Sequence, residues 1–144
     1  MNAIKCKDEF IKKNPQYINC HIEVFKFGDD CDYLANLVKD GIKTATSSLL
    51  KLYEIENSRI PEIGDIGIIL DSLDNVVCVI QNIKVSINSF LMIDDYIAKC
   101  EGEGDTLDFW RKTHESFFKK EVVNYGVDFS FTDEVVVEFF KLID

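Results

Sequence analysis

Two apolar segments separated by a short polar stretch constrain the fold of this chain most. Residues 66–70 and 76–85 are dominated by Ile, Val and Leu, whereas residues 71–75 (Asp-Ser-Leu-Asp-Asn) carry side chains typical of a tight turn. We therefore expect two strands joined as an antiparallel hairpin. Alternating β-favouring residues over 20–27 predict an earlier strand, and the Val-rich, then aromatic segment 134–143 predicts a final one.

Helices are expected between these strands. Their predicted ranges are 8–13, stopped by Asn14-Pro15; a segment capped by Asp29 or Asp30 and ending at Asp40; 94–100; and 106–124, capped by Asp105. Residues 49–55 fit either a short helix or a continuing strand. Hairpin connections with segregated helices predict an α+β fold around a mainly antiparallel, barrel-like sheet. Neither repeats nor linkers divide the chain, so one domain over 1–144 is expected.

The charge of the chain limits its partners. It has 26 acidic and 16 basic residues, a formal net charge of −10. Such a field repels a polyanion, so a long, nonspecific nucleic-acid partner is not expected and a small ligand fits better. No segment approaches the roughly 20 apolar residues of a membrane span, so we expect no membrane partner. Five scattered cysteines without a Cys-x-x-Cys pair predict reduced thiols in a cytoplasmic protein, with no zinc site and no cofactor.

The densest group of reactive side chains is the segment 41–49, Gly-Ile-Lys-Thr-Ala-Thr-Ser-Ser-Leu. Lys43 and Thr46 lie three residues apart, so they can act together only if the chain turns or bulges here. A hydroxyl needs an adjacent base to become a nucleophile, and a desolvated lysine is one such base. Alternatively, Gly41 ends a helix, Lys43 compensates its dipole, and the threonines begin a strand.

Acidic and aromatic residues supply further candidates. In the segment 101–105 (Glu-Gly-Glu-Gly-Asp), the two glycines could free the backbone to aim Glu103 inward, or the segment could be a solvated connector. His114 lies among aromatic residues at helical spacing, which favours a structural histidine over a general base. Trp110 fits the core, or the border of a ligand cleft. The acids at 29, 30 and 32 fit helix capping better than a metal site.

These features together resemble the ASCH-domain family. The resemblance covers nearly the whole chain, in order, through Phe27-Gly28-Asp29, Gly41-x-Lys43-Thr44-x-Thr46, Tyr53-Glu54, Gly64-Asp65, residues 101–105, Leu107, Trp110-Arg111, His114 and Phe117-Phe118. It implies a small PUA-like β-barrel with a cleft between barrel and helices. It also implies binding of RNA or nucleotides, and some members of the family are nucleases.

One bacterial branch of the family hydrolyses N4-acetylcytidine to cytidine and acetate. Similarity to this branch implies catalytic roles for Lys43, Thr46 and Glu103. The expected substrate-binding residues are Thr44, Tyr53, Trp110, Arg111 and His114. This chain is longer than that branch and carries the Tyr53-Glu54 and Trp110-Arg111 features of another subgroup, which leaves the substrate open.

Three functions therefore compete. The first is an amidohydrolase acting on an acylated nucleoside, in which Lys43 takes the proton of Thr46 and Glu103 positions the lysine or manages the proton. The second is a module that binds a nucleoside, nucleotide or short RNA, with Lys43 and Arg111 on phosphate and Trp110 or Tyr53 stacking on a base. The third is a metal-dependent ribonuclease using Glu101, Glu103 and Asp105.

Overall fold

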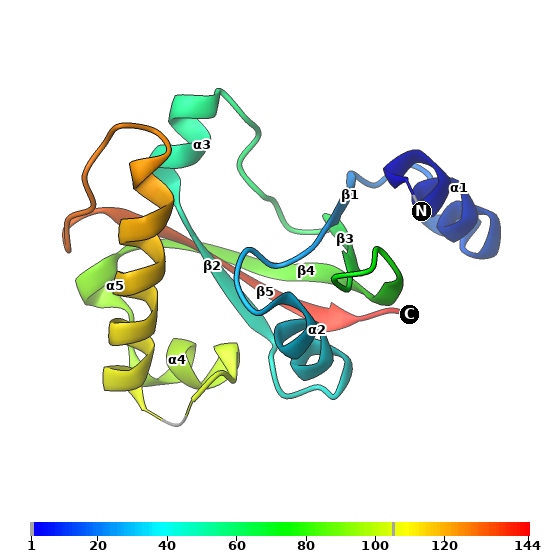
Figure 1. Ribbon diagram of the computed structural model, residues 1–144. Helices are drawn as coiled ribbons and strands as arrows, with labels where there is room; N and C mark the ends of the chain where they lie inside the picture. Colours follow the sequence, from blue (N-terminus) through cyan, green and yellow to red (C-terminus); the bar gives the residue numbers. More distant parts are fainter. Residues whose placement is uncertain (1, 105) are drawn as a thin grey trace.

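The computed structural model describes residues 2–104 and 106–144 (Figure 1). Its elements in chain order are α1 (Ala3–Lys13), η1 (Pro15–Tyr17), β1 (Ile22–Phe25), α2 (Cys31–Lys39), β2 (Ala45–Leu49), α3 (Leu50–Glu56), β3 (Ile66–Leu70), β4 (Val76–Ser89), η2 (Phe90–Met92), α4 (Asp95–Glu101), α5 (Leu107–Val123) and β5 (Glu134–Leu142). The segment that fitted either a helix or a strand is the helix α3. Within the described ranges, no helix combines the length and apolar character needed to cross a membrane.

The strands form one mixed sheet in the order β1-β3-β4-β5-β2. The predicted hairpin is confirmed: β3 pairs antiparallel with β4, and Asp71 Oδ1 accepts hydrogen bonds from the backbone N–H groups of Leu73 and Asn75 in the turn. β5 pairs antiparallel with both β4 and β2, whereas β1 pairs parallel with β3. The predicted α+β class is therefore correct.

The expected closure of the sheet into a barrel is not shown. The strand order ends at β1 on one side and β2 on the other, and no ladder joins these two strands among the residues that the structure describes. In Figure 1, α4 and α5 lie at one end of the sheet and α1 at the other, with α2 between them. Both edge strands therefore remain available to border a cleft.

Three apolar clusters hold the helices on the sheet. One packs α4, α5 and the aromatic residues around Phe90 against β2 and β5; a second packs α1 against β1 and β3; a third packs α2 against β3, β4 and β5. Because β3 is buried on both faces, all five of its residues are apolar or glycine. The sheet is thus fixed from several sides, which makes it a rigid support for side chains at its edges.

Only one of the two predicted aspartate caps lies within the described residues. Asp30 occupies the N-cap position of α2, but its side chain makes no capping hydrogen bond; Asp32 instead accepts hydrogen bonds from the backbone N–H (2.6 Å) and hydroxyl (2.7 Å) of Ser72. Asp105, the predicted cap of the long helix, lies outside the described residues. In the described part, Thr106 Oγ1 caps α5 by accepting from the backbone N–H of Phe109 (3.1 Å).

Candidate functional site

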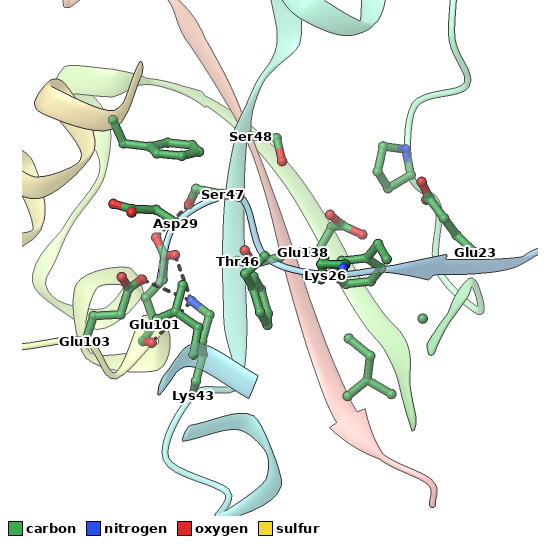
Figure 2. Close-up of a pocket in the computed structure, with 18 of the residues that line it drawn as sticks. Glu23, Lys26, Asp29, Lys43, Thr46, Ser47, Ser48, Glu101, Glu103 and Glu138 are labelled. Carbon is green, nitrogen blue, oxygen red and sulfur yellow. Dashed lines mark hydrogen bonds and ion pairs between the residues drawn. The ribbon is translucent and has the colours of Figure 1, made fainter. Parts of the chain in front are cut away.

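A cleft of about 610 Å³ opens between the two edge strands. β1 contributes Glu23 and Phe25, β2 contributes Thr46, Ser47 and Ser48, and the inner strands, the loop after β1 and α5 complete its wall. Figure 2 shows two groups of polar side chains here. Lys43, Ser47, Glu101 and Glu103 lie together on one side of β2, and Glu138 and Glu23 lie on the other side, with Thr46 between the groups.

Lys43 enters the cleft from a turn between α2 and β2. Gly41 has a positive φ of 77°, and the N–H groups of Ile42 and Lys43 both bond to the carbonyl of Leu37 (2.9 and 3.0 Å), which ends the helix. Thr44 then donates to the carbonyl of Cys100 through its backbone N–H (2.7 Å) and its hydroxyl (3.2 Å). The turn over residues 40–42 therefore comes before Lys43 and does not lie between Lys43 and Thr46, and Thr44 anchors the segment after it to the end of α4.

The Lys43 ammonium lies between two carboxylates. Its Nζ is 3.3 Å from Glu101 Oε1 and 3.1 Å from Glu103 Oε2, and it also donates to the backbone carbonyl of Glu101 (3.4 Å). The side chains of Lys43 and Glu101 are each only 1% exposed, and that of Glu103 is 17% exposed. Buried charges of this kind persist only when they are paired and hydrogen-bonded, which is the arrangement observed.

Glu101 is the centre of this cluster. Ser47 Oγ donates to Glu101 Oε2 (2.7 Å), and the indole N–H of Trp110 donates to the same oxygen. Burial on its own would raise the pKa of Glu101, but the charges of Lys43 and His114 and the hydrogen bonds from His114 and Trp110 hold that pKa at about 2. Glu101 is therefore ionised throughout the neutral range.

His114 completes the charge balance of the cluster. Its Nδ1 lies 2.9 Å from the carbonyl oxygen of Trp110, and its Nε2 lies 3.4 Å from Glu101 Oε1. Both ring nitrogens thus face acceptors, a geometry that only the doubly protonated imidazolium satisfies. Burial opposes that charge, but the carboxylate of Glu101 outweighs it and raises the pKa of His114. Two cations then offset the two carboxylates.

Three of these groups are also compatible with metal ligation. Ligand atoms of Glu101, Glu103 and His114 all lie within 4.8 Å of one another. The Lys43 ammonium, however, already lies between the two carboxylates and supplies the positive charge that a cation would bring. A metal ion could bind here only by displacing this lysine.

The glycines flanking Glu103 fit a packed loop rather than a solvated connector. Gly102 ends α4 with a φ of +70°, and a Cβ there would come within 2.6 Å of the carbonyl oxygen of Ile42. A Cβ on Gly104 would come within 2.2 Å of the ring of Phe109. The backbone therefore passes too close to its neighbours for any larger residue, and this close approach aims Glu103 at Lys43.

Thr46 lines the same cleft as Lys43 and Glu103. The three predicted residues thus converge on one cleft, although their roles remain predictions. In the sheet register Thr46 lies directly opposite Glu138, so both side chains project from the same face. Its hydroxyl makes no hydrogen bond with any residue that the structure describes, Lys43 included, and is free to meet a ligand.

The five expected substrate-binding residues divide into two groups. Tyr53 and His114 line the cleft, and burial raises the pKa of Tyr53 to about 12, so that it stays a neutral phenol. Thr44, Trp110 and Arg111 lie outside the cleft wall. The hydroxyl of Thr44 bonds to the carbonyl of Cys100, Trp110 stacks on His114 with 4.1 Å between ring centroids, and Arg111 donates to the carbonyl of Leu91 (3.2 Å).

Sequence reasoning missed the polar group on the other side of β2. Asn82 Nδ2 donates to Glu138 Oε1 (2.9 Å), and both residues line the cleft. Burial raises the pKa of Glu138, although the hydrogen bond from Asn82 opposes this. A usable signal was present: Glu138 is the one charged residue in the run Val-Val-Val-Glu-Phe-Phe over 135–140, where a buried strand would otherwise be entirely apolar.

Comparison with known proteins gave a family model and several solved structures. The model described as ASCH domain matches residues 23–144. An ASCH domain from Lactobacillus crispatus JV V101 is 24% identical over 94% of this chain and 90% of its own, with a TM-score of 0.86. Protein EF3133 from Enterococcus faecalis V583 is 30% identical over 96% and 85%, with a TM-score of 0.84.

A more distant structure, a mutant form of the ZmASCH protein from Zymomonas mobilis, is 9% identical over 85% of this chain and 73% of its own, with a TM-score of 0.50. This likeness concerns the fold alone. No curated protein matches the chain.

Proposed function

The chain belongs to the ASCH-domain family, and from this premise and the geometry of the cleft we propose that it binds an unphosphorylated nucleoside and hydrolyses an N4-acyl amide of its cytosine base. The observation that carries the proposal is the Lys43–Glu103 contact of 3.1 Å in the same cleft as the Thr46 hydroxyl, which has no hydrogen-bond partner among the described residues. A base, a proton carrier and a nucleophile are the parts that amide cleavage through a hydroxyl requires.

The size and charge of the cleft support an uncharged ligand. A volume of about 610 Å³ lies within the usual range for small-molecule sites. Carboxylates outnumber lysines and arginines in the cleft wall by eight to three. The eight carboxylate residues are Glu23, Asp29, Asp30, Asp65, Glu101, Glu103, Glu121 and Glu138. The three basic residues are Lys26, Lys43 and Arg59.

Each of these three cations already has a carboxylate partner. Lys43 contacts Glu101 and Glu103, Arg59 contacts Asp65 (2.5 Å), and Lys26 contacts Asp74 (2.5 Å). Among the described lining residues, a phosphate would find no unpaired lysine or arginine. The cleft therefore favours a nucleoside over a nucleotide or an RNA backbone.

The proposed reaction begins with the transfer of a proton from the Lys43 ammonium to Glu103. The neutral amine then takes the proton of Thr46 Oγ1 as that oxygen attacks the acyl carbonyl carbon. The bond from this carbon to N4 breaks, and N4 leaves as the amino group of cytidine with a proton from Lys43. Water next attacks the threonyl ester and loses a proton to Lys43. The bond to Thr46 Oγ1 then breaks, Lys43 returns that proton to Oγ1, the carboxylic acid is released, and Glu103 gives its proton back to Lys43.

Chromatography of N4-acetylcytidine incubated with the purified protein tests this proposal. Thr46→Ala should abolish cytidine formation and leave the affinity for N4-acetylcytidine within a few-fold, because the substitution removes little ground-state contact. Lys43→Ala should also lose turnover, and the double variant should be no worse than either single one. Thr132→Ala is the matched control that keeps activity, because Thr132 lies outside the cleft wall. Undiminished hydrolysis by Thr46→Ala would refute the nucleophile assignment.

A nucleoside-binding module without turnover is the second candidate. The observation that favours it is the Lys43 ammonium itself, which is buried between two carboxylates and makes no contact with Thr46 in the described structure. In that case N4-acetylcytidine binds, and no cytidine forms with any variant. A binding titration next to the chromatographic assay separates the two candidates.

A further inference from the structure

The polar pair Asn82–Glu138 lines the cleft but has no part in the proposed reaction. It is formed across β4 and β5, on the same face of the sheet as Thr46. The register of β4 against β5 shifts at Ile83, so that Asn82 lies opposite Phe140 while Lys84 lies opposite Phe139. Neighbouring residues of β5 face opposite ways, and the shift therefore turns Lys84 away from the face that carries Asn82.

This bulge keeps the positive charge of Lys84 away from Glu138. In a regular strand, residues 82 and 84 would share a face and the ammonium of Lys84 would lie on the cleft side. Instead Lys84 lies over the ring of Phe139 on the other face, with Nζ 5.2 Å from the ring centroid. Bulges often occur where a strand must re-aim a side chain beside a binding site.

Among the described residues, two hydrogen-bond acceptors of this pair have no partner. Asn82 is only 5% exposed, and its Nδ2 is engaged by Glu138 Oε1 (2.9 Å) and by the carbonyl of Glu62 (3.4 Å). Within the described residues, neither Asn82 Oδ1 nor Glu138 Oε2 receives a hydrogen bond. Acceptors held at the wall of a cleft without a donor are suited to the N–H groups of a ligand.

We propose that Asn82 and Glu138 form a recognition subsite for the exocyclic N–H of a cytosine-type base. The inference rests on the proposed function, because it places this N–H beside Thr46. A secondary amide carries its N–H next to its carbonyl carbon, and Glu138 lies directly opposite Thr46 in the sheet. An amide whose carbonyl faces Thr46 can therefore donate its N–H to Glu138, and a base with an oxygen at this position cannot.

Calorimetric titration with cytidine and uridine tests the subsite. Cytidine carries an amino group where uridine carries a carbonyl oxygen, and that oxygen would face the acceptors of Glu138 and Asn82. The intact chain and Thr46→Ala should therefore bind cytidine about tenfold or more tightly than uridine, as expected for a hydrogen bond to a charged group. Glu138→Gln keeps the shape of the side chain and adds an N–H donor, so it should remove or reverse this preference.

Glu134→Gln is the matched control, because it removes a carboxylate from the same strand, β5, at an exposed position outside the cleft wall; it should keep the preference for cytidine. Urea unfolding of both variants should show unchanged folding. Equal binding of the two nucleosides, binding of neither, or an unchanged preference in Glu138→Gln would overturn the subsite. A preference for cytidine without hydrolysis of N4-acetylcytidine refutes only the reaction. Hydrolysis without an effect of Glu138→Gln on the preference refutes only the subsite.

Discussion

Replacing Glu101 by glutamine removes one buried charge and keeps the shape of the side chain. In the intact chain this carboxylate faces Lys43 and His114 and accepts hydrogen bonds from Ser47 and Trp110. After the substitution, His114 faces a neutral amide, and Lys43 keeps only Glu103 as a charged partner. We therefore expect Glu101→Gln to be among the more destabilising substitutions of a polar residue in this protein.

The magnitude follows from the protonation equilibrium of Glu101. Its pKa falls from an ordinary 4.5 to about 2, and each unit of pKa corresponds to about 1.4 kcal/mol, so the surroundings favour the charged form by about 3 kcal/mol. This agrees with the roughly 3–5 kcal/mol lost when one partner of a buried ion pair is removed. For a chain of this length, a loss of about 3 kcal/mol lowers Tm by roughly 6–12 °C.

Equilibrium urea unfolding at pH 7, followed by circular dichroism, measures this loss. Glu103→Gln is the matched control, because Glu103 is more exposed and contacts only Lys43 among the described residues; we expect it to lose about 1 kcal/mol. A loss below about 1 kcal/mol in Glu101→Gln, or equal losses in both variants, would refute the assignment of Glu101 as the electrostatic centre.

Three further predictions follow from the same structure. The folded-state pKa of Glu101 is depressed, so its contribution to the free energy of unfolding should be lost as pH falls from about 4.5 to about 2. The pKa of His114 is raised, so the contribution of His114 should be present below pH 6.5 and lost as pH rises through the folded-state pKa. Urea midpoints measured against pH should show both trends, and the loss at acid pH should be smaller in Glu101→Gln. Gly102→Ala should cost about 2 kcal/mol or more and Gly126→Ala only about 1 kcal/mol by urea unfolding, since both have positive φ but only the first Cβ would clash. Burial raises the pKa of Cys78 to about 11, so mass spectrometry after brief alkylation of the native protein should find Cys78 unmodified and the more exposed Cys31 modified, whereas equal labelling would contradict this.

The local part of the fold could be predicted from the sequence because it depends on local chemistry. Polar turn residues between two apolar runs specify a hairpin, and proline or glycine marks the helix ends that the structure shows at Asn14 and Gly41. The parallel pairing of β1 with β3 was not predictable in this way. Two helices and a strand separate these two strands in the chain, so their pairing is decided by tertiary packing rather than by any local pattern.

In the candidate site, too, features of the local backbone could be predicted and features of tertiary packing could not. The glycines around Glu103 are a local feature, and together with the resemblance to the ASCH-domain family they indicated that Glu103 lies in the same cleft as Lys43. The position of Glu101 could not be predicted, because it depends on how the last turn of α4 packs against β2 and α5. Trp110 and Arg111 are adjacent on α5 and therefore point about 100° apart, so the burial of Trp110 turns Arg111 towards Leu91.

The open sheet and the cleft have a common explanation. Edge strands expose unpaired backbone groups, and a closed barrel would remove that liability. In this chain, pairing β1 with β2 would bring Glu23 and Phe25 against Thr46 and Ser48 and fill the space that the cleft occupies. The edges are instead kept short, at four residues in β1 and five in β2. An open edge of this kind lets one rigid sheet present Thr46 and Glu138 side by side to a ligand, while the buried ion pair of Lys43 and Glu101 lies beside β2 in the wall of the same cleft.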